Sequence, residues 1–151
     1  MEPITRLNYP LDLSRLAPAV EHARSIAQGY SDHRYPAPAM NWKIARYTTD
    51  YIEQIGSDFG IKCDPRFYFA SANSIIGTHI DNGTLCSINF ILSDDPSPVT
   101  FGTNDYVYKQ ALLNTSIPHG VKNGPVGRVL LKFSIFDESY ESLASRIPYR
   151  L

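Results

Sequence analysis

Two hydrophobic patterns divide this chain near Gly60, and the second one constrains the fold most. Before Gly60, apolar residues recur at helical spacing over 14–28 and 50–59. After Gly60, apolar strand-like runs are separated by turn-forming residues such as Asn82-Gly83. These runs cover residues 66–72, 74–80, 84–92, 106–114 and 127–136. Helices followed by a series of short strands predict an α+β, mainly β fold with a core of the jelly-roll type.

The length of 151 residues suits a single domain, 1–151. We expect a helical N-terminal part, 1–60, that packs on a strand core, 61–136, and is followed by a C-terminal helix and tail, 137–151. Since this chain is short for such a core, the N-terminal part and the loops over 30–41 and 93–105 are expected to supply the walls of any pocket.

Helix-capping residues mark where the two N-terminal helices should begin. Ser14 is the expected N-cap of the first helix, which places Pro18 near the first turn, where proline is tolerated. Thr48 or Thr49 is the expected N-cap of the second helix, and Gly60 is expected to end it.

Charge and cysteine content exclude several classes of function. The chain has 14 basic and 15 acidic residues, so it lacks the basic excess that nucleic acid or an anionic membrane surface would attract. It shows neither an apolar run of the length of a membrane helix nor a signal-peptide pattern. Cys63 and Cys86 are too few for a disulfide framework. We therefore expect a cytoplasmic protein with no nucleic-acid or membrane partner.

Two histidines and an aspartate in the strand region form a candidate metal site. His79 and Asp81 are two residues apart, so an extended strand points both side chains to one face. His119 follows after enough residues for the chain to return to the same place. Two imidazoles and one carboxylate make the facial triad of non-haem Fe(II) oxygenases. The alternative is a hydrogen bond between His79 and Asp81 that merely stabilises the following turn.

The run that starts at Arg128 has one apolar and one partly polar face. The apolar face carries Val129, Leu131, Phe133 and Ile135. The other face carries Arg128, Leu130, Lys132 and Ser134. These polar groups face either the inside of a barrel, where Arg128 offers a planar fork to a carboxylate, or solvent on an edge strand. The run over 84–92 shows the same division, because Ser87 and Asn89 alternate with Cys86, Ile88 and Phe90.

The order His79-x-Asp81, His119, Arg128 resembles that of the Fe(II)- and 2-oxoglutarate-dependent oxygenases. Residues 111–135, ALLNTSIPHGVKNGPVGRVLLKFSI, are similar to the distal-histidine region of the small prolyl- and aspartyl/asparaginyl-hydroxylase-like members. Residues 77–93, GTHIDNGTLCSINFILS, are similar to the other half of that site. The resemblance spans residues 65–136 and implies a double-stranded β-helix, that is, a jelly-roll or cupin-like core.

This resemblance implies a ligand set and a reaction. His79, Asp81 and His119 would bind Fe(II), and Arg128 would pair with the distal carboxylate of the co-substrate 2-oxoglutarate. The protein would then use O2 to hydroxylate a C–H bond of an amino acid or peptide side chain and release succinate and CO2. Asp81 favours hydroxylation, since halogenating relatives lack this carboxylate.

Members of the family often add a hydroxyl or amide donor to the distal carboxylate, and here Tyr68, Asn89 and Ser134 are the candidates. Lys132 could compete with Arg128 for the same carboxylate. Two other functions stay open at this point. The chain could be a cupin-like metal-binding protein without 2-oxoglutarate chemistry, or a non-catalytic binding barrel in which the triad is accidental.

Overall fold

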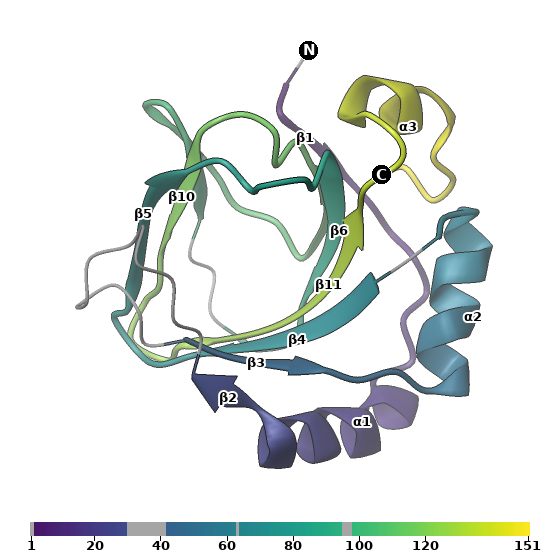
Figure 1. Ribbon diagram of the computed structural model, residues 1–151, viewed down its shortest axis with the longest axis vertical. Helices are drawn as coiled ribbons and strands as arrows, with labels where there is room; N and C mark the ends of the chain where they lie inside the picture. Colours follow the sequence, from purple (N-terminus) through teal and green to yellow (C-terminus); the bar gives the residue numbers. More distant parts are fainter. Residues whose placement is uncertain (1, 30–41, 63, 95–97) are drawn as a thin grey trace.

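The computed structural model describes residues 2–29, 42–62, 64–94 and 98–151, and it consists of two facing antiparallel sheets with three helices (Figure 1). The seven-stranded sheet has the order β1-β9-β6-β11-β4-β3-β2, and the four-stranded sheet has the order β5-β10-β7-β8. The helices are α1 (Leu13–Ile26), α2 (Asp50–Phe59) and α3 (Tyr140–Arg146). The strands are β1 (Ile4–Arg6), β2 (Gln28–Gly29), β3 (Trp42–Arg46), β4 (Asp64–Ala70), β5 (Ile75–His79), β6 (Cys86–Ile91), β7 (Val99–Phe101), β8 (Asn104–Tyr106), β9 (Gln110–Leu113), β10 (His119–Lys122) and β11 (Arg128–Ile135). This architecture confirms the predicted mainly β, jelly-roll fold.

The outer face of the seven-stranded sheet is covered by an apolar core, and its inner face is directed toward the smaller sheet. All three helices contribute to the apolar core on the outer face, and α1 lies against β3 and β4 (Figure 1). Its fully buried side chains include Leu16, Ile52, Phe59, Phe67, Phe90, Phe133 and Leu143. A smaller apolar cluster fills part of the space between the sheets and includes Ile4, Ile91, Val99, Leu113 and Leu130.

Strand β11 lies in the middle of the large sheet, hydrogen-bonded to β6 on one side and to β4 on the other. Leu131 and Phe133 belong to the outer core, whereas Arg128 and Lys132 lie among the residues between the sheets. The predicted alternation is therefore confirmed, and exposure on an edge strand is excluded. Because β11 lies between β4 and β6, the charged side chains of Arg128 and Lys132 are buried between the two sheets.

Capping explains where the helices begin. The hydroxyl of Thr49 accepts a hydrogen bond from the Ile52 amide, and Gly60 ends α2 in the left-handed conformation, as expected. The expected cap at Ser14 is wrong, because the extended residue before α1 is Asp12, whose carboxylate accepts from the Ser14 amide. Pro18 consequently lies beyond the first turn, and the carbonyl it leaves unbonded can be hydrated because this side of α1 is exposed.

Strand pairing brings more of the chain into the sheets than the expected strand runs contained. The N-terminal part supplies β1, β2 and β3 to the large sheet in addition to its two helices. Strands β7 and β10 come from segments with no predicted strand, and the expected strand over 106–114 is divided between β8 and β9. The expected loop over 30–41 lies outside the described residues, as does Cys63. Every helix in the described part of the chain is too short or too polar to pass through a bilayer.

Candidate metal centre and its cavity

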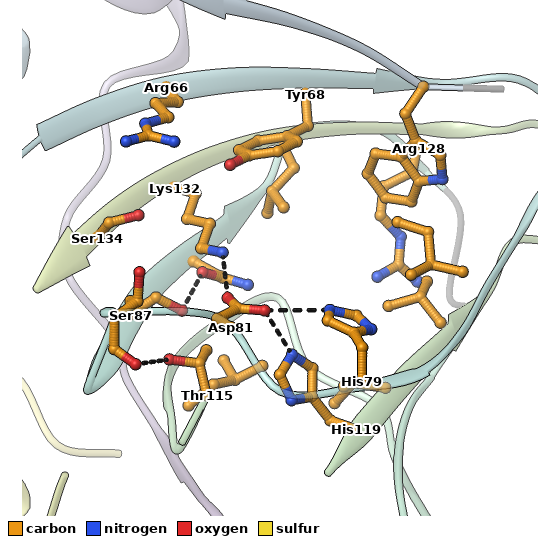
Figure 2. Close-up of a pocket in the computed structure, with 18 of the residues that line it drawn as sticks. Arg66, Tyr68, His79, Asp81, Ser87, Thr115, His119, Arg128, Lys132 and Ser134 are labelled. Atoms are coloured by element: carbon orange, nitrogen blue, oxygen red, sulfur yellow. Dashed lines mark hydrogen bonds and ion pairs between the residues drawn. The ribbon is translucent and has the colours of Figure 1, made fainter. Parts of the chain in front are cut away.

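The smaller sheet brings the two histidines together. His79 ends β5 and His119 begins β10, and the two residues are direct partners in the antiparallel pairing of these strands. Their ring centroids are 4.4 Å apart. Asp81 follows β5, and its amide donates to the carbonyl of Thr115, which fixes the turn. As a result, Oδ1 of Asp81 lies 3.0 Å from Nε2 of His79 and 3.3 Å from Nε2 of His119 (Figure 2).

Backbone contacts orient both imidazoles toward a common point. Nδ1 of His79 is 2.8 Å from the carbonyl of Gly77, and Nδ1 of His119 is 2.8 Å from the carbonyl of Ile117. A carbonyl only accepts hydrogen bonds, so Nδ1 carries the proton and Nε2 of a neutral ring presents a lone pair. Adjacent ligand atoms of an octahedron with bonds of about 2.1 Å lie about 3.0 Å apart. The spacing from each imidazole to Asp81 therefore fits a divalent cation between the three groups.

The second oxygen of Asp81 is held by a lysine. Nζ of Lys132 on β11 is 2.9 Å from Oδ2 of Asp81, so the carboxylate bridges the two sheets. Burial opposes ionisation of Asp81, but the ammonium of Lys132 and the neighbouring imidazoles outweigh it and hold the pKa of Asp81 far below its usual range. The carboxylate is thus ionised, which is the form that binds a metal.

A cavity of about 200 Å³ lies between the sheets, with the triad in its wall. The large sheet supplies the other wall, with Tyr68 from β4, Asn89 from β6 and four side chains of β11. The predicted site residues that line the cavity are Tyr68, His79, Asp81, Asn89, His119, Arg128, Lys132 and Ser134. Val99, Leu113, Val121 and Leu130 add apolar surface. The cavity wall thus combines apolar surface with many polar and charged side chains, which could orient a small polar ligand.

Arg128 lies at one end of the row of cavity-facing side chains on β11. It is 2% exposed, and it follows Gly127, whose φ of +83° and close approach to the Ala70 carbonyl leave no room for a Cβ. Ser134 is six residues further along β11, about 20 Å at strand spacing. Of the three candidate second donors, the structure therefore separates Ser134 from Arg128 (Figure 2).

Tyr108 is a cavity residue that the sequence pattern did not reveal. It lies between β8 and β9, it is buried, and its hydroxyl accepts a hydrogen bond of 3.1 Å from Nδ2 of Asn89. Burial raises the pKa of Tyr108, and the charge of Arg128 partly opposes this shift. Both side chains line the cavity. The alternation over 106–114 could not indicate this position, because the chain leaves the sheet between Tyr106 and Gln110.

Cys86 does not belong to the site. It is fully buried on the outer face of β6, and its thiol donates to the carbonyl of Glu138. Burial, with Glu138 as a smaller contribution, raises the pKa of Cys86 to about 12. A protonated, buried thiol is a small apolar packing group.

Comparison with known proteins shows the fold. No family model matches the sequence, and no curated protein matches it. A prolyl-4-hydroxylase from Pseudomonas putida has a TM-score of 0.61 at 13% identity, covering 89% of this chain and 91% of that one. A 2OG-Fe(II) oxygenase family oxidoreductase from Burkholderia pseudomallei has a TM-score of 0.54 at 15% identity, covering 82% of this chain and 78% of that one.

A more distant likeness is to the Rhodobacter sphaeroides complex of SigE with the anti-sigma ChrR, with a TM-score of 0.44 and 11% identity. The match covers 68% of this chain and 49% of that one, so this chain spans about half the length of that protein. The chain therefore has a cupin-like jelly-roll fold in which His79, Asp81 and His119 make a candidate metal site.

Proposed function

We propose that this protein is an Fe(II)- and 2-oxoglutarate-dependent dioxygenase that hydroxylates a C–H bond of an amino acid or peptide side chain. The observation that carries the proposal is the facial arrangement of His79, Asp81 and His119 toward a cavity that also holds the buried guanidinium of Arg128. Three ligands on one side of a metal leave adjacent positions for a chelating keto acid and for O2. The likeness in fold to two oxygenases supports this proposal.

In this proposal, different residues of the cavity would have different roles. Bound Fe(II) would supply the activation of O2. Arg128 would hold the distal carboxylate of 2-oxoglutarate in a charge-assisted pair, with the nearby Tyr108 hydroxyl as the second donor. Lys132 would fix the orientation of Asp81 through Oδ2, which leaves Oδ1 to ligate. The apolar side chains of the cavity would exclude water and seat the hydrocarbon part of the substrate.

Anaerobic titration of the purified protein tests the proposal. Fe(II) is added first, then 2-oxoglutarate, and the absorption spectrum is recorded after each addition. We expect stoichiometric metal binding and a weak visible charge-transfer band when the keto acid chelates the metal. Succinate release with O2 is then screened over amino acids and peptides. Metal binding without keto-acid binding would indicate the cupin-like alternative, and no metal binding would indicate a non-catalytic barrel.

A further inference from the structure

Arg66 and Lys132 form a pair of cationic side chains in the cavity wall, away from Arg128. Arg66 on β4 is the direct partner of Lys132 on β11, so both side chains leave the sheet on the same face. Lys132 is four residues from Arg128, about 13 Å along the strand. Figure 2 shows Arg66 and Tyr68 along one wall, with Lys132 between them and Asp81. Like charges in directly opposite positions repel, so this arrangement requires anions nearby.

Carboxylates in the structure satisfy only part of this requirement. Lys132 is paired with Asp81, and one terminal nitrogen of Arg66 donates to Asp64 at 2.6 Å. Nε of Arg66 is buried and has no hydrogen-bond acceptor among the described residues. Asp64 does not line the cavity, whereas Arg66 does. The guanidinium of Arg66 therefore retains donor capacity for a further acceptor at the cavity wall.

Exposure indicates which ligand each cation would meet. The side chain of Arg66 is 23% exposed, whereas Arg128 is 2% exposed. Arg66 is therefore accessible to solvent, whereas Arg128 is not.

We propose that Arg66 binds a carboxylate of the substrate that is oxidised, so that the substrate is an amino acid or peptide that presents a free carboxylate to the open end of the cavity. This inference rests on the proposed function and deepens it. Two carboxylates would then lie along β11, that of 2-oxoglutarate at Arg128 and that of the substrate at Arg66, beside Lys132 and Tyr68.

Calorimetric binding without turnover tests this subsite. Anaerobic protein is loaded with Mn(II) and saturated with 2-oxoglutarate. It is then titrated with a panel of amino acids and tripeptides, each as the free acid and as the corresponding amide. We expect an acid that binds about tenfold or more tightly than its amide. Arg66→Gln should abolish the preference and Arg66→Lys should restore part of it. Arg24→Gln, at an exposed arginine of α1 on the outer face of the sheet, should leave it unchanged.

Several outcomes would overturn the subsite. These are equal binding of every acid and its amide, no binding by any acid, or a preference that survives Arg66→Gln. Weaker 2-oxoglutarate binding in Arg66→Gln, with the panel unaffected, would assign Arg66 to the co-substrate and also refute the inference. Failure of the Mn(II)-loaded protein to bind 2-oxoglutarate contradicts the proposed function instead, and the acid-amide comparison without 2-oxoglutarate still tests Arg66.

Discussion

Lys132 and Asp81 join the two sheets through a 2.9 Å contact between Nζ and Oδ2, on the carboxylate oxygen that the imidazoles do not face. Both side chains are about one-seventh exposed, at 14% and 15%. The pair therefore neutralises Lys132 and presents Oδ1 to the metal position. Stability and metal binding depend on the same carboxylate, and substitutions can separate the two.

Asp81→Ala should abolish binding of Fe(II) or Mn(II), as measured by calorimetry, and should stop turnover. It should also lower the free energy of unfolding of the metal-free protein by about 3 kcal/mol, because Lys132 is left in the cavity without a counter-charge. The double variant Asp81→Ala/Lys132→Met should recover most of that stability without regaining metal binding. Full metal affinity in Asp81→Ala would refute the triad.

Arg128→Gln should weaken 2-oxoglutarate binding by about 2 kcal/mol, roughly thirtyfold, since it removes a charge-assisted pair. The dissociation constant is measured on the Mn(II)-loaded protein, and thermal unfolding checks that the variant is folded. Arg128→Lys keeps the charge and should lose less. If Arg128→Gln binds normally and Lys132→Met does not, the role belongs to Lys132.

Tyr108→Phe should raise the dissociation constant of 2-oxoglutarate about fivefold, the value of roughly one neutral hydrogen bond. Ser134→Ala is the matched removal of a hydroxyl at the other end of β11, and it should leave this constant unchanged. Tyr68→Phe tests the remaining hydroxyl candidate in the same assay. A larger effect at Tyr68 than at Tyr108 would reassign the second donor.

Gly127→Ala should destabilise the protein by about 3 kcal/mol, because it adds both left-handed strain and a Cβ 2.5 Å from the Ala70 carbonyl oxygen. Gly83→Ala is the matched control, since Gly83 has a φ of +79° but open space around it, and it should cost about 1 kcal/mol. Urea unfolding measures both. Equal costs would show that the backbone at Gly127 can move away from β4.

Alkaline pH should destabilise the protein partly through Cys86. Its pKa is raised to about 12 by burial, so the folded state favours the protonated thiol. This contribution is complete below the unfolded-state pKa of about 8.5 and is lost as pH rises from there toward the folded-state value. Cys86→Ala should show a smaller loss of stability between pH 8 and 10. Peptide mapping should find Cys86 unmodified by iodoacetamide at pH 8 until the protein unfolds.

Local patterns determined what the sequence could predict. The alternation of β11 and the Thr49 and Gly60 caps of α2 depend on neighbouring residues, and the structure confirms them. The two-residue separation predicted that His79 and Asp81 lie close together, although Asp81 follows the end of β5 and is fixed by its bond to the Thr115 carbonyl. His119 joins them through strand pairing across the smaller sheet, which the sequence only allowed and did not specify.

The features that the sequence did not predict depend on pairing between segments far apart in the chain. Strand β2 has two residues, Gln28 and Gly29, which are too few for any period to show. Tyr108 enters the cavity from between two strands, where alternation does not apply. Arg66 did share the alternation of Tyr68, but one charged residue at a strand end is usually hydrated. Only its pairing opposite Lys132 shows that it lines the cavity.

The central place of β11 has a consequence for how this protein can change over evolutionary time. Deleting or inserting one residue within the strand would exchange its two sides, so Lys132 would be forced among the aromatic side chains under the helices while Phe133 entered the cavity. Substitutions on the cavity side of β11 can thus change the ligand chemistry while the outer core stays intact, whereas a one-residue shift of the strand disturbs the core and the site together.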